Sequence, residues 1–418
     1  MGLGRGGLRR LRAPALRPFW TLVGVRAAFL LATALTLLWQ LPRFSAVDRD
    51  LRFDEFRAYG GLSDWLFNVF TQWDAGWYLN IAGNGYGGDQ AAAFFPLYPA
   101  AVALVAVVTR SLVVAGVLVS LVAAGIAAVC LHRIGRELLG DRQASDAVLL
   151  LATYPVAFVF TSVYPEGLFL AFATGATLAA LRGRSVLAGV LGGLAVGTRL
   201  IGLALLPMLA LLLYRRAGGA QVDGGGDGGV QRHLRALAPL ALLPGAVVVF
   251  ALHLEDRLGR PWAFLSAQED FWGRHTPTLG PLGGLWEAFD QGRRGAMQVL
   301  LHLPRAMEFG WAEESGSRNA LHLLLLAAAV WLTWEAWRRL GPAFGLYSAA
   351  YLLVILSAPV AGFPLVSLPR FLLGDFPLFL ALAAVLERRP RARALVLYAF
   401  VAIGGMAAVG FARHAWVA

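Results

Sequence analysis

Apolar stretches of about 17–25 residues recur from Phe19 to the C-terminus, the length that an α-helix needs to cross a bilayer. The alternation in roughly ten-residue segments that is typical of an outer-membrane barrel is not seen. The apolar runs and their breakers predict helices near 19–41, 94–109, 112–132, 146–163, 166–181, 186–198, 200–214, 236–254, 319–338, 342–358, 370–387 and 394–412. We therefore expect one all-α, polytopic transmembrane domain over residues 1–418, with about 11–12 transmembrane or re-entrant helices.

The distribution of charge agrees with a membrane protein and argues against a nucleic-acid partner. The net charge is +11, and all 36 basic residues are arginines that cluster in short tracts beside apolar segments. This is the pattern of the positive-inside rule. It places the basic N-terminus, residues 1–18, and the Gly/Arg-rich linker, residues 215–235, in the cytoplasm. The abundance of Arg, Ala and Gly without Lys suggests a GC-rich bacterial genome.

The same rule predicts which loops face outward. With the arginine tracts at 182–184, 215–235, 338–339 and 388–393 inside, the loops 42–93 and 255–318 lie outside, and the second is expected to hold amphipathic helices on the membrane surface. We thus expect a multi-pass protein of the cytoplasmic membrane with its site on the extracytoplasmic side. One conflict remains, because the basic segment 132–142 falls outside if 94–109 and 112–132 both cross. Either 94–109 only dips into the membrane, or the charge rule fails there.

The first outer loop carries the main candidate for chemistry. Asp74 stands in the sequence W-D-x-x-W-Y, between Trp73 and the pair Trp77-Tyr78. Aromatic rings on both sides would partly remove water from the carboxylate, which suits a general base. The alternative is an interfacial aromatic belt in which Asp74 only caps a helix. Asp89, farther along the loop, is a second candidate carboxylate for substrate binding.

Three further charges stand at the outer ends of apolar segments. Glu166 follows Tyr164-Pro165, and a carboxylate there is costly unless it faces water, a partner or a ligand, although it also suits a helix cap. Arg199 has no basic neighbours and lies between apolar segments, so we expect an acidic or anionic partner for it. Arg370 opens a late helix, where it either binds a lipid phosphate or reaches to the membrane interface.

The remaining polar motifs give weaker signals. Gln268 and Trp272 of the 255–318 loop are candidate substrate-binding residues, although single residues here more often serve the fold. Asp48-Arg49-Asp50 resembles a metal–nucleotide motif, but its charged neighbours favour a solvated turn. Neither this turn nor the lone His275 predicts a metal site, so we expect no metal or other cofactor. No nucleotide-binding or common protease motif occurs in the chain.

Taken in order, six segments resemble one family. They are WDAGWYLNIAGNGY, FFPLYP, TSVYPEGLF, GTRLIG, PWAFLSAQEDFWGR and SLPRFLLGDFPLF, which run from about residue 70 to 380. They resemble the glycosylphosphatidylinositol mannosyltransferase 2 (PIG-V-like) family and its bacterial relatives, of the GT-C class of glycosyltransferases. The resemblance implies a GT-C fold, a polyprenyl-phosphate sugar as donor, mannose as its sugar, and a catalytic acid in the first outer loop, which is Asp74 here. Gln72, Pro165 and Leu200 depart from the family pattern and affect substrate detail.

We therefore expect a membrane glycosyltransferase, specifically a mannosyltransferase, that inverts the anomeric centre with Asp74 as general base. The expected donor is a polyprenyl-phosphate sugar, and membrane lipids are expected to surround the protein. The acceptor is a hydroxyl of a lipid, glycan or protein that the sequence does not identify. The alternative is a lipid or sugar transporter or flippase, which would also use charged residues beside broken helices. It is disfavoured by the lack of a visible repeat and by the gathering of the polar motifs on one face.

Overall fold

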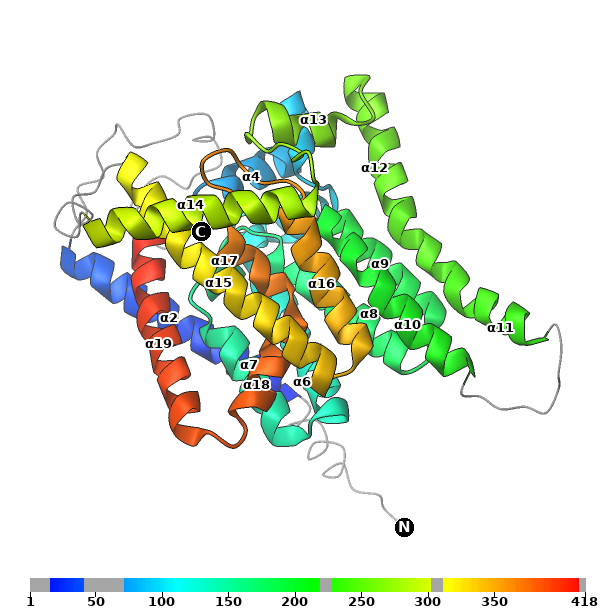
Figure 1. Ribbon diagram of the computed structural model, residues 1–418. Helices are drawn as coiled ribbons and strands as arrows, with labels where there is room; N and C mark the ends of the chain where they lie inside the picture. Colours follow the sequence, from blue (N-terminus) through cyan, green and yellow to red (C-terminus); the bar gives the residue numbers. More distant parts are fainter. Residues whose placement is uncertain (1–15, 41–70, 219–227, 302–310, 413–418) are drawn as a thin grey trace, which may run out of the picture.

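The computed structural model describes residues 16–40, 71–218, 228–301 and 311–412, and these residues fold into helices (Figure 1). The longer ones are α2 (Arg17–Gln40), α4 (Asp74–Asn84), α5 (Leu97–Thr109), α6 (Leu112–Leu138), α7 (Asp141–Thr153), α8 (Glu166–Leu181), α9 (Ser185–Thr198), α10 (Leu205–Gly218), α11 (Gly228–Leu237), α12 (Leu242–Leu258), α14 (Pro281–Leu301), α15 (Trp311–Arg339), α16 (Pro342–Leu356), α18 (Phe376–Leu386) and α19 (Pro390–Ala412). The shorter ones are η5 (Asp89–Ala93), η6 (Ala157–Thr161), η7 (Leu200–Ala204), η8 (Ala238–Ala241), α13 (Ala263–Asp270), α17 (Leu368–Phe371) and η9 (Leu372–Gly374).

Several of these helices are long and apolar enough to cross a membrane. In the described parts of the chain there are six, and a seventh if the bent pair Leu368–Gly374 and Phe376–Leu386, which meet at 85°, forms one span. Four shorter apolar helices accompany them. The expectation of an all-α, polytopic membrane protein is thereby confirmed.

Prolines explain where single predicted helices are divided. The segment 146–163 is divided because α7 ends at Thr153, two residues before Pro155, and η6 follows. The segment 370–387 breaks at Asp375, two residues before Pro377, which lies in the first turn of α18. Pro155 disfavours helical geometry in Tyr154, which is extended. Pro377 lacks the N–H that would continue the helix across Asp375, but it fits the first turn of a new helix.

The arginine-rich turns meet at one end of the molecule. Arg182, after α8, donates to Glu137 near the end of α6 at 3.0 Å. Arg393, in α19, holds Asp146 of α7 through two hydrogen bonds of 2.8 and 2.5 Å. The end of α6 and the start of α7 therefore lie beside the turns that follow α8 and α18.

This arrangement bears on the conflict in the predicted topology. The hydroxyl of Tyr98, in the first turn of α5, lies 3.2 Å from the carbonyl oxygen of Gly116 and 2.8 Å from the Ser120 hydroxyl, so α5 and α6 form a hairpin. The 13 residues of α5 are about 20 Å long, which is too short for a hydrocarbon core of about 30 Å. The segment 132–142 thus lies near the turns after α8 and α18, as expected if 94–109 does not cross the membrane.

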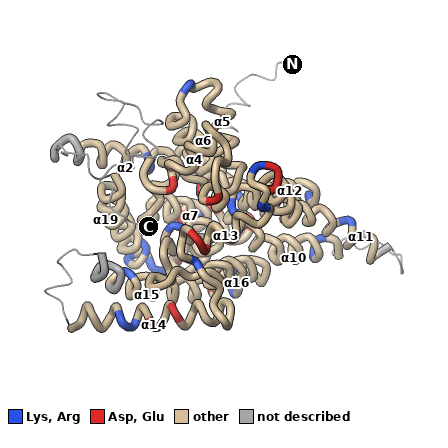
Figure 2. The backbone as a smooth tube through the Cα atoms, turned by 90° about the horizontal axis from the view of Figure 1, so that it is seen from above, with Lys and Arg blue, Asp and Glu red and all other residues tan. Residues whose placement is uncertain are grey.

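The opposite end is covered by α4, α13 and α14, which lie across the upper part of the molecule in Figure 1. Seen from above in Figure 2, α4 and α13 lie near the centre and α14 runs along one edge. These elements come from the described parts of the two predicted outer loops. Below them, α8 begins against α6, so closely that a Cβ atom on Gly167 would overlap the carbonyl oxygen of Ser120. This close packing brings the first turn of α8, and with it Glu166, under α4.

Candidate functional site

Asp74 is the first residue of α4, and its carboxylate lies inside the protein. The side chain is 14% exposed, and its Oδ2 atom accepts a hydrogen bond of 2.6 Å from Nη1 of Arg370. These residues are 296 positions apart in the chain. The ion pair therefore joins the first outer segment to the start of the bent helix pair near the C-terminus.

Unusual backbone geometry precedes both partners. Trp73, directly before Asp74, has a φ of 60°, and Ser367, three residues before Arg370, has a φ of 62°. Positive φ values are rare for residues with a Cβ, and for a bulky residue such as tryptophan they indicate strain that the surroundings must hold. The positive φ of Trp73 changes the chain direction directly before α4, so that Asp74, the first residue of the helix, faces Arg370.

A second ion pair lies directly beside the first. Glu166, the first residue of α8, is 3% exposed, and its Oε1 atom accepts a hydrogen bond from Nη1 of Arg199. The Nε atom of Arg370 lies 3.5 Å from the same oxygen. The four predicted residues thus form one chain of contacts, Asp74–Arg370–Glu166–Arg199. The other oxygen of Glu166 is buried without a hydrogen-bond partner.

A third arginine, which the sequence did not single out, joins this group. Arg274 donates from Nη1 to the carbonyl oxygen of Ala358 at 2.7 Å, and its backbone forms an antiparallel bridge with Val360. Burial, followed by the nearby positive charges of Arg370 and Arg199, lowers the pKa of Arg274 to about 10. The side chain still carries its charge at neutral pH.

The ring of Phe371 connects the three arginines. The guanidinium carbon of Arg199 lies 5.1 Å from the ring centroid, and those of Arg274 and Arg370 lie 5.6 Å from it. A cation within about 6 Å of an aromatic face is attracted to it. The Phe371 ring therefore contacts all three guanidinium groups, whose mutual repulsion is offset by the carboxylates of Asp74 and Glu166.

Three aromatic residues that the sequence analysis names, Trp77, Tyr78 and Trp272, surround the ring of Phe94. Trp77 stacks on Phe94 at 5.9 Å, and Tyr78 and Trp272 meet its ring edge-to-face at 5.0 and 5.6 Å. Burial raises the pKa of the Tyr78 hydroxyl far above its usual range, so it remains a hydrogen-bond donor. The indole N–H of Trp272 is buried without a partner. These groups form an aromatic wall next to Asp74, made by α4, the residue after η5 and the turn after α13.

The other predicted residues lie in different surroundings. Asp89 forms an ion pair with Arg260 in the loop before α13, which connects η5 to that loop. The carbonyl oxygen of Gln268 accepts a 2.9 Å hydrogen bond from the Arg274 backbone N–H, so its backbone shapes the turn that carries Arg274. Asp48-Arg49-Asp50 lies outside the described residues. Within the described ranges, no group of three or more His, Cys, Asp or Glu side chains is placed to hold a metal ion.

Comparison with known sequences finds one similar family, which matches the first part of the chain. The family Mannosyltransferase (PIG-V) matches residues 23–217, the segment that contains Asp74, Glu166 and Arg199. This part of the chain, somewhat less than half of it, resembles the PIG-V mannosyltransferases. It is 35% identical over 154 residues to GPI alpha-1,6-mannosyltransferase 2 of Cricetulus griseus and 35% identical over 160 residues to that of Mus musculus. These alignments cover 34% and 35% of this chain and 31% and 32% of the relatives, so the match spans about a third of their length.

Solved structures give a weaker likeness. An oligosaccharyltransferase of Archaeoglobus fulgidus, in complex with zinc and sulfate, aligns with a TM-score of 0.40 and 13% identity over 94% of this chain and 53% of its own. Its complex with an inhibitory peptide and a dolichol-phosphate aligns with a TM-score of 0.35 and 12% identity, over 93% and 55%. These scores are too low to establish a shared fold.

Proposed function

We propose that this protein is a membrane glycosyltransferase of the GT-C type, which moves a sugar, mannose by family likeness, from a polyprenyl-phosphate donor to an acceptor hydroxyl. The observation that carries the proposal is the buried contact chain Asp74–Arg370–Glu166–Arg199 with Arg274 beside it. The similarity of residues 23–217 to the PIG-V mannosyltransferases supports the proposed class of reaction.

Asp74 is the proposed general base. The acceptor O–H gives its proton to the Asp74 carboxylate while its oxygen attacks the anomeric carbon, and the bond from that carbon to the donor phosphate oxygen breaks with its electron pair. Attack from the face opposite the phosphate inverts the anomeric centre. A positioned base contributes about 10²–10⁴-fold to such a step.

The arginines are the proposed phosphate site. Arg199, Arg274 and Arg370 carry three positive charges against the two negative charges of Asp74 and Glu166, an excess of one. A sugar-phosphate diester carries one negative charge, so a bound donor would neutralise the cluster. Guanidinium groups in a site shielded from water stabilise the charge that develops on the departing phosphate. The proposal therefore requires no metal.

In this arrangement Arg370 has two competing partners. It holds Asp74 at 2.6 Å, and a donor phosphate would compete with that carboxylate for the same guanidinium. A carboxylate paired with arginine is a weaker base than a free one, because the positive charge favours its ionised form. Binding of the donor would then both neutralise Arg370 and release Asp74 to accept a proton.

The proposal also covers the contacts to the sugar or lipid and the side of the membrane on which transfer takes place. Trp77, Tyr78 and Trp272 would contact the sugar or the lipid chain. The site lies at the end away from the arginine-rich turns, which by the positive-inside rule is the extracytoplasmic side of the cytoplasmic membrane.

The proposal is tested by transfer of radiolabelled mannose from polyprenyl-phosphate mannose in membranes that contain the protein. Asp74→Asn is expected to lower turnover at least a hundredfold while the protein stays folded and membrane-inserted. Asp89→Asn is the matched control, because Asp89 is an acid of the same segment that pairs with Arg260 instead. Retention of more than a tenth of the wild-type rate by Asp74→Asn would exclude Asp74 as the base. Binding or translocation of the lipid by wild type without transfer would favour the transporter alternative.

A further inference from the structure

Arg26 is a buried charge of α2 that has no acidic partner among the residues the structure describes. It is 1% exposed and lies within the candidate span Arg17–Thr36. Its guanidinium carbon lies 4.2 Å from the centroid of the Phe29 ring, and its Nε atom has no hydrogen-bond partner. A charged arginine within a membrane is costly unless it pairs with an anion or reaches water.

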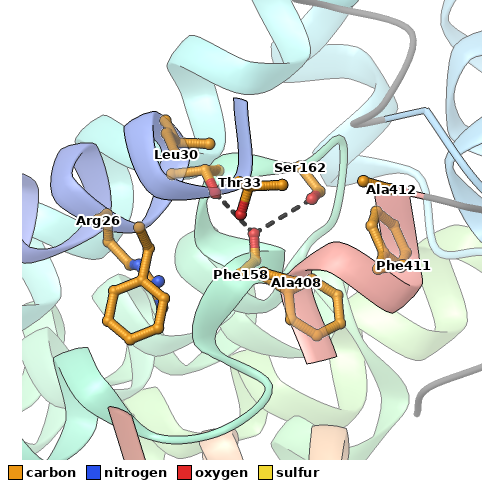
Figure 3. A pocket seen from close by; sticks show the side chains of 10 residues that line it. Arg26, Leu30, Thr33, Phe158, Ser162, Ala408, Phe411 and Ala412 are labelled. Atoms are coloured by element: carbon orange, nitrogen blue, oxygen red, sulfur yellow. Dashed lines mark hydrogen bonds between the residues drawn. The ribbon is translucent and has the colours of Figure 1, made fainter. Parts of the chain in front are cut away.

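The Arg26 side chain borders a small cavity, shown in Figure 3. The cavity is large enough for about one water molecule. Three elements enclose it: α2, η6 with the following residue, and the last turns of α19. The lining residues are Arg26, Phe29, Leu30, Thr33, Phe158, Thr161, Ser162, Ala408, Phe411 and Ala412.

The chemistry of the lining favours an anion over a cation or an apolar ligand. Arg26 contributes the charge, and Thr33, seven residues later on the same face of α2, contributes a hydroxyl. The hydroxyls of Thr161 and Ser162 both donate to the carbonyl oxygen of Phe158, at 2.8 and 3.1 Å. No carboxylate lines the cavity, and the carbonyl oxygen of Phe158 is already occupied by these two hydroxyls, so Arg26 and Thr33 are the groups that can contact an anion there.

This cavity is separate from the Asp74 site. Phe411 lines the cavity and packs against the ring of Tyr164 at 6.0 Å. The guanidinium carbon of Arg370 lies 5.3 Å from the centroid of that same Tyr164 ring. Two aromatic rings, those of Phe411 and Tyr164, therefore separate the cavity from Arg370, and Arg26 takes no part in the proposed transfer step.

The helices that enclose the cavity also carry lipid-facing side chains. The cavity lies beside the middle of α2 and the last turns of α19, and both helices carry exposed apolar side chains such as Leu31 and Met406. Such side chains on spanning helices contact lipid. A lipid headgroup is therefore tested beside free ions as the source of the anion.

We propose that Arg26 and Thr33 form a second binding site, for a single small anion: a chloride ion, or one anionic oxygen of a phosphate group. The phosphate belongs either to inorganic phosphate or to the headgroup of an anionic lipid. The site would stabilise the packing of α2 on η6 and α19 by neutralising a buried charge. It does not depend on the proposed transferase activity.

The test is the thermal unfolding of the full-length protein in phosphatidylcholine nanodiscs. Sodium gluconate is replaced by sodium chloride, or by sodium phosphate, at constant ionic strength in one arm, and phosphatidylglycerol replaces part of the phosphatidylcholine in the other. We expect a saturable rise of about 2–5 °C in the unfolding temperature of wild type in at least one arm. The rise should be absent in Arg26→Met and reduced in Thr33→Val. Arg389→Met, which removes an exposed arginine after α18, should respond as wild type does.

The two arms identify the source of the anion. A rise with chloride or phosphate alone assigns a free ion, and a rise with phosphatidylglycerol alone assigns a lipid headgroup. Equal responses of wild type, Arg26→Met and Thr33→Val in both arms would overturn the site. If Arg26→Met does not fold, the Thr33→Val response decides the question, because this variant keeps the charge and removes only the hydroxyl.

Discussion

The ion pair between Glu166 and Arg199 allows the folding role and the substrate role of one residue to be separated. Removing one partner from a buried pair costs about 3–5 kcal/mol of stability, because the other charge remains without compensation. Glu166 is 3% exposed, but Arg370 Nε stays 3.5 Å from its Oε1 atom when Arg199 is removed. We therefore expect Arg199→Met to cost about 3 kcal/mol, at the lower end of this range.

The reverse change and the double change follow from the same geometry. Glu166→Gln leaves Arg199, which is 16% exposed and contacts the Phe371 ring, so its cost should be smaller, about 2 kcal/mol. The double variant removes both charges and should return to within about 1 kcal/mol of wild-type stability. Thermal unfolding in detergent measures each of these values.

Activity should not follow stability in this series. If Arg199 binds the donor phosphate, the double variant lacks that contact and should stay about 10²–10³-fold below wild type in the mannosyl-transfer assay. Arg199→Lys should keep most of the stability, since a charge remains, but should lower transfer, because an ammonium group lacks the planar pair of donors. A stable double variant with at least half of the wild-type turnover would refute the reasoning and make this pair structural. Arg370 and Arg274 would then be the remaining phosphate ligands.

Two further predictions concern Arg274 and the orientation in the membrane. Arg274→Gln should raise the KM for the donor about tenfold, through loss of one charged phosphate contact worth about 1.4 kcal/mol, with a smaller change in kcat; an unchanged KM would limit Arg274 to its contact with Ala358. In a variant with Cys130→Ala, a cysteine at Gly87 should react with a membrane-impermeant thiol reagent in intact cells, and one at Gly229 should not. Both positions have open space for a side chain. The opposite labelling pattern would reverse the proposed orientation.

The sequence was sufficient to find three of the charged residues whose burial is costly. Glu166, Arg199 and Arg370 could be recognised because each is a charge beside apolar segments, where a partner is required whatever the fold. Their pairing was not predictable in the same way. Whether Arg370 meets Asp74 depends on contacts between residues 296 positions apart, and these are set by how α17 packs against α4.

Arg274 and Asp89 show why loops were harder to interpret. Arg274 stands among Gln268, Glu269, Asp270 and His275, so nothing in its local sequence marks it as buried. Its burial arises from the bridge to Val360, which brings the loop after α16 over it. Asp89, the second candidate carboxylate of the first outer loop, forms an ion pair with Arg260, a contact that the local sequence does not indicate.

The charge of the site depends on both halves of the chain. The segment that matches the PIG-V family, residues 23–217, supplies Asp74, Glu166 and Arg199, which together carry one excess negative charge. Alone, this set would repel a phosphate. Arg274 and Arg370 lie beyond the matched segment, and they change the excess to one positive charge. The second half of the chain therefore supplies the charge that the proposed anionic donor requires beside the carboxylates of the first half. Substitutions at Arg274 and Arg370 should affect use of this donor more than use of the acceptor.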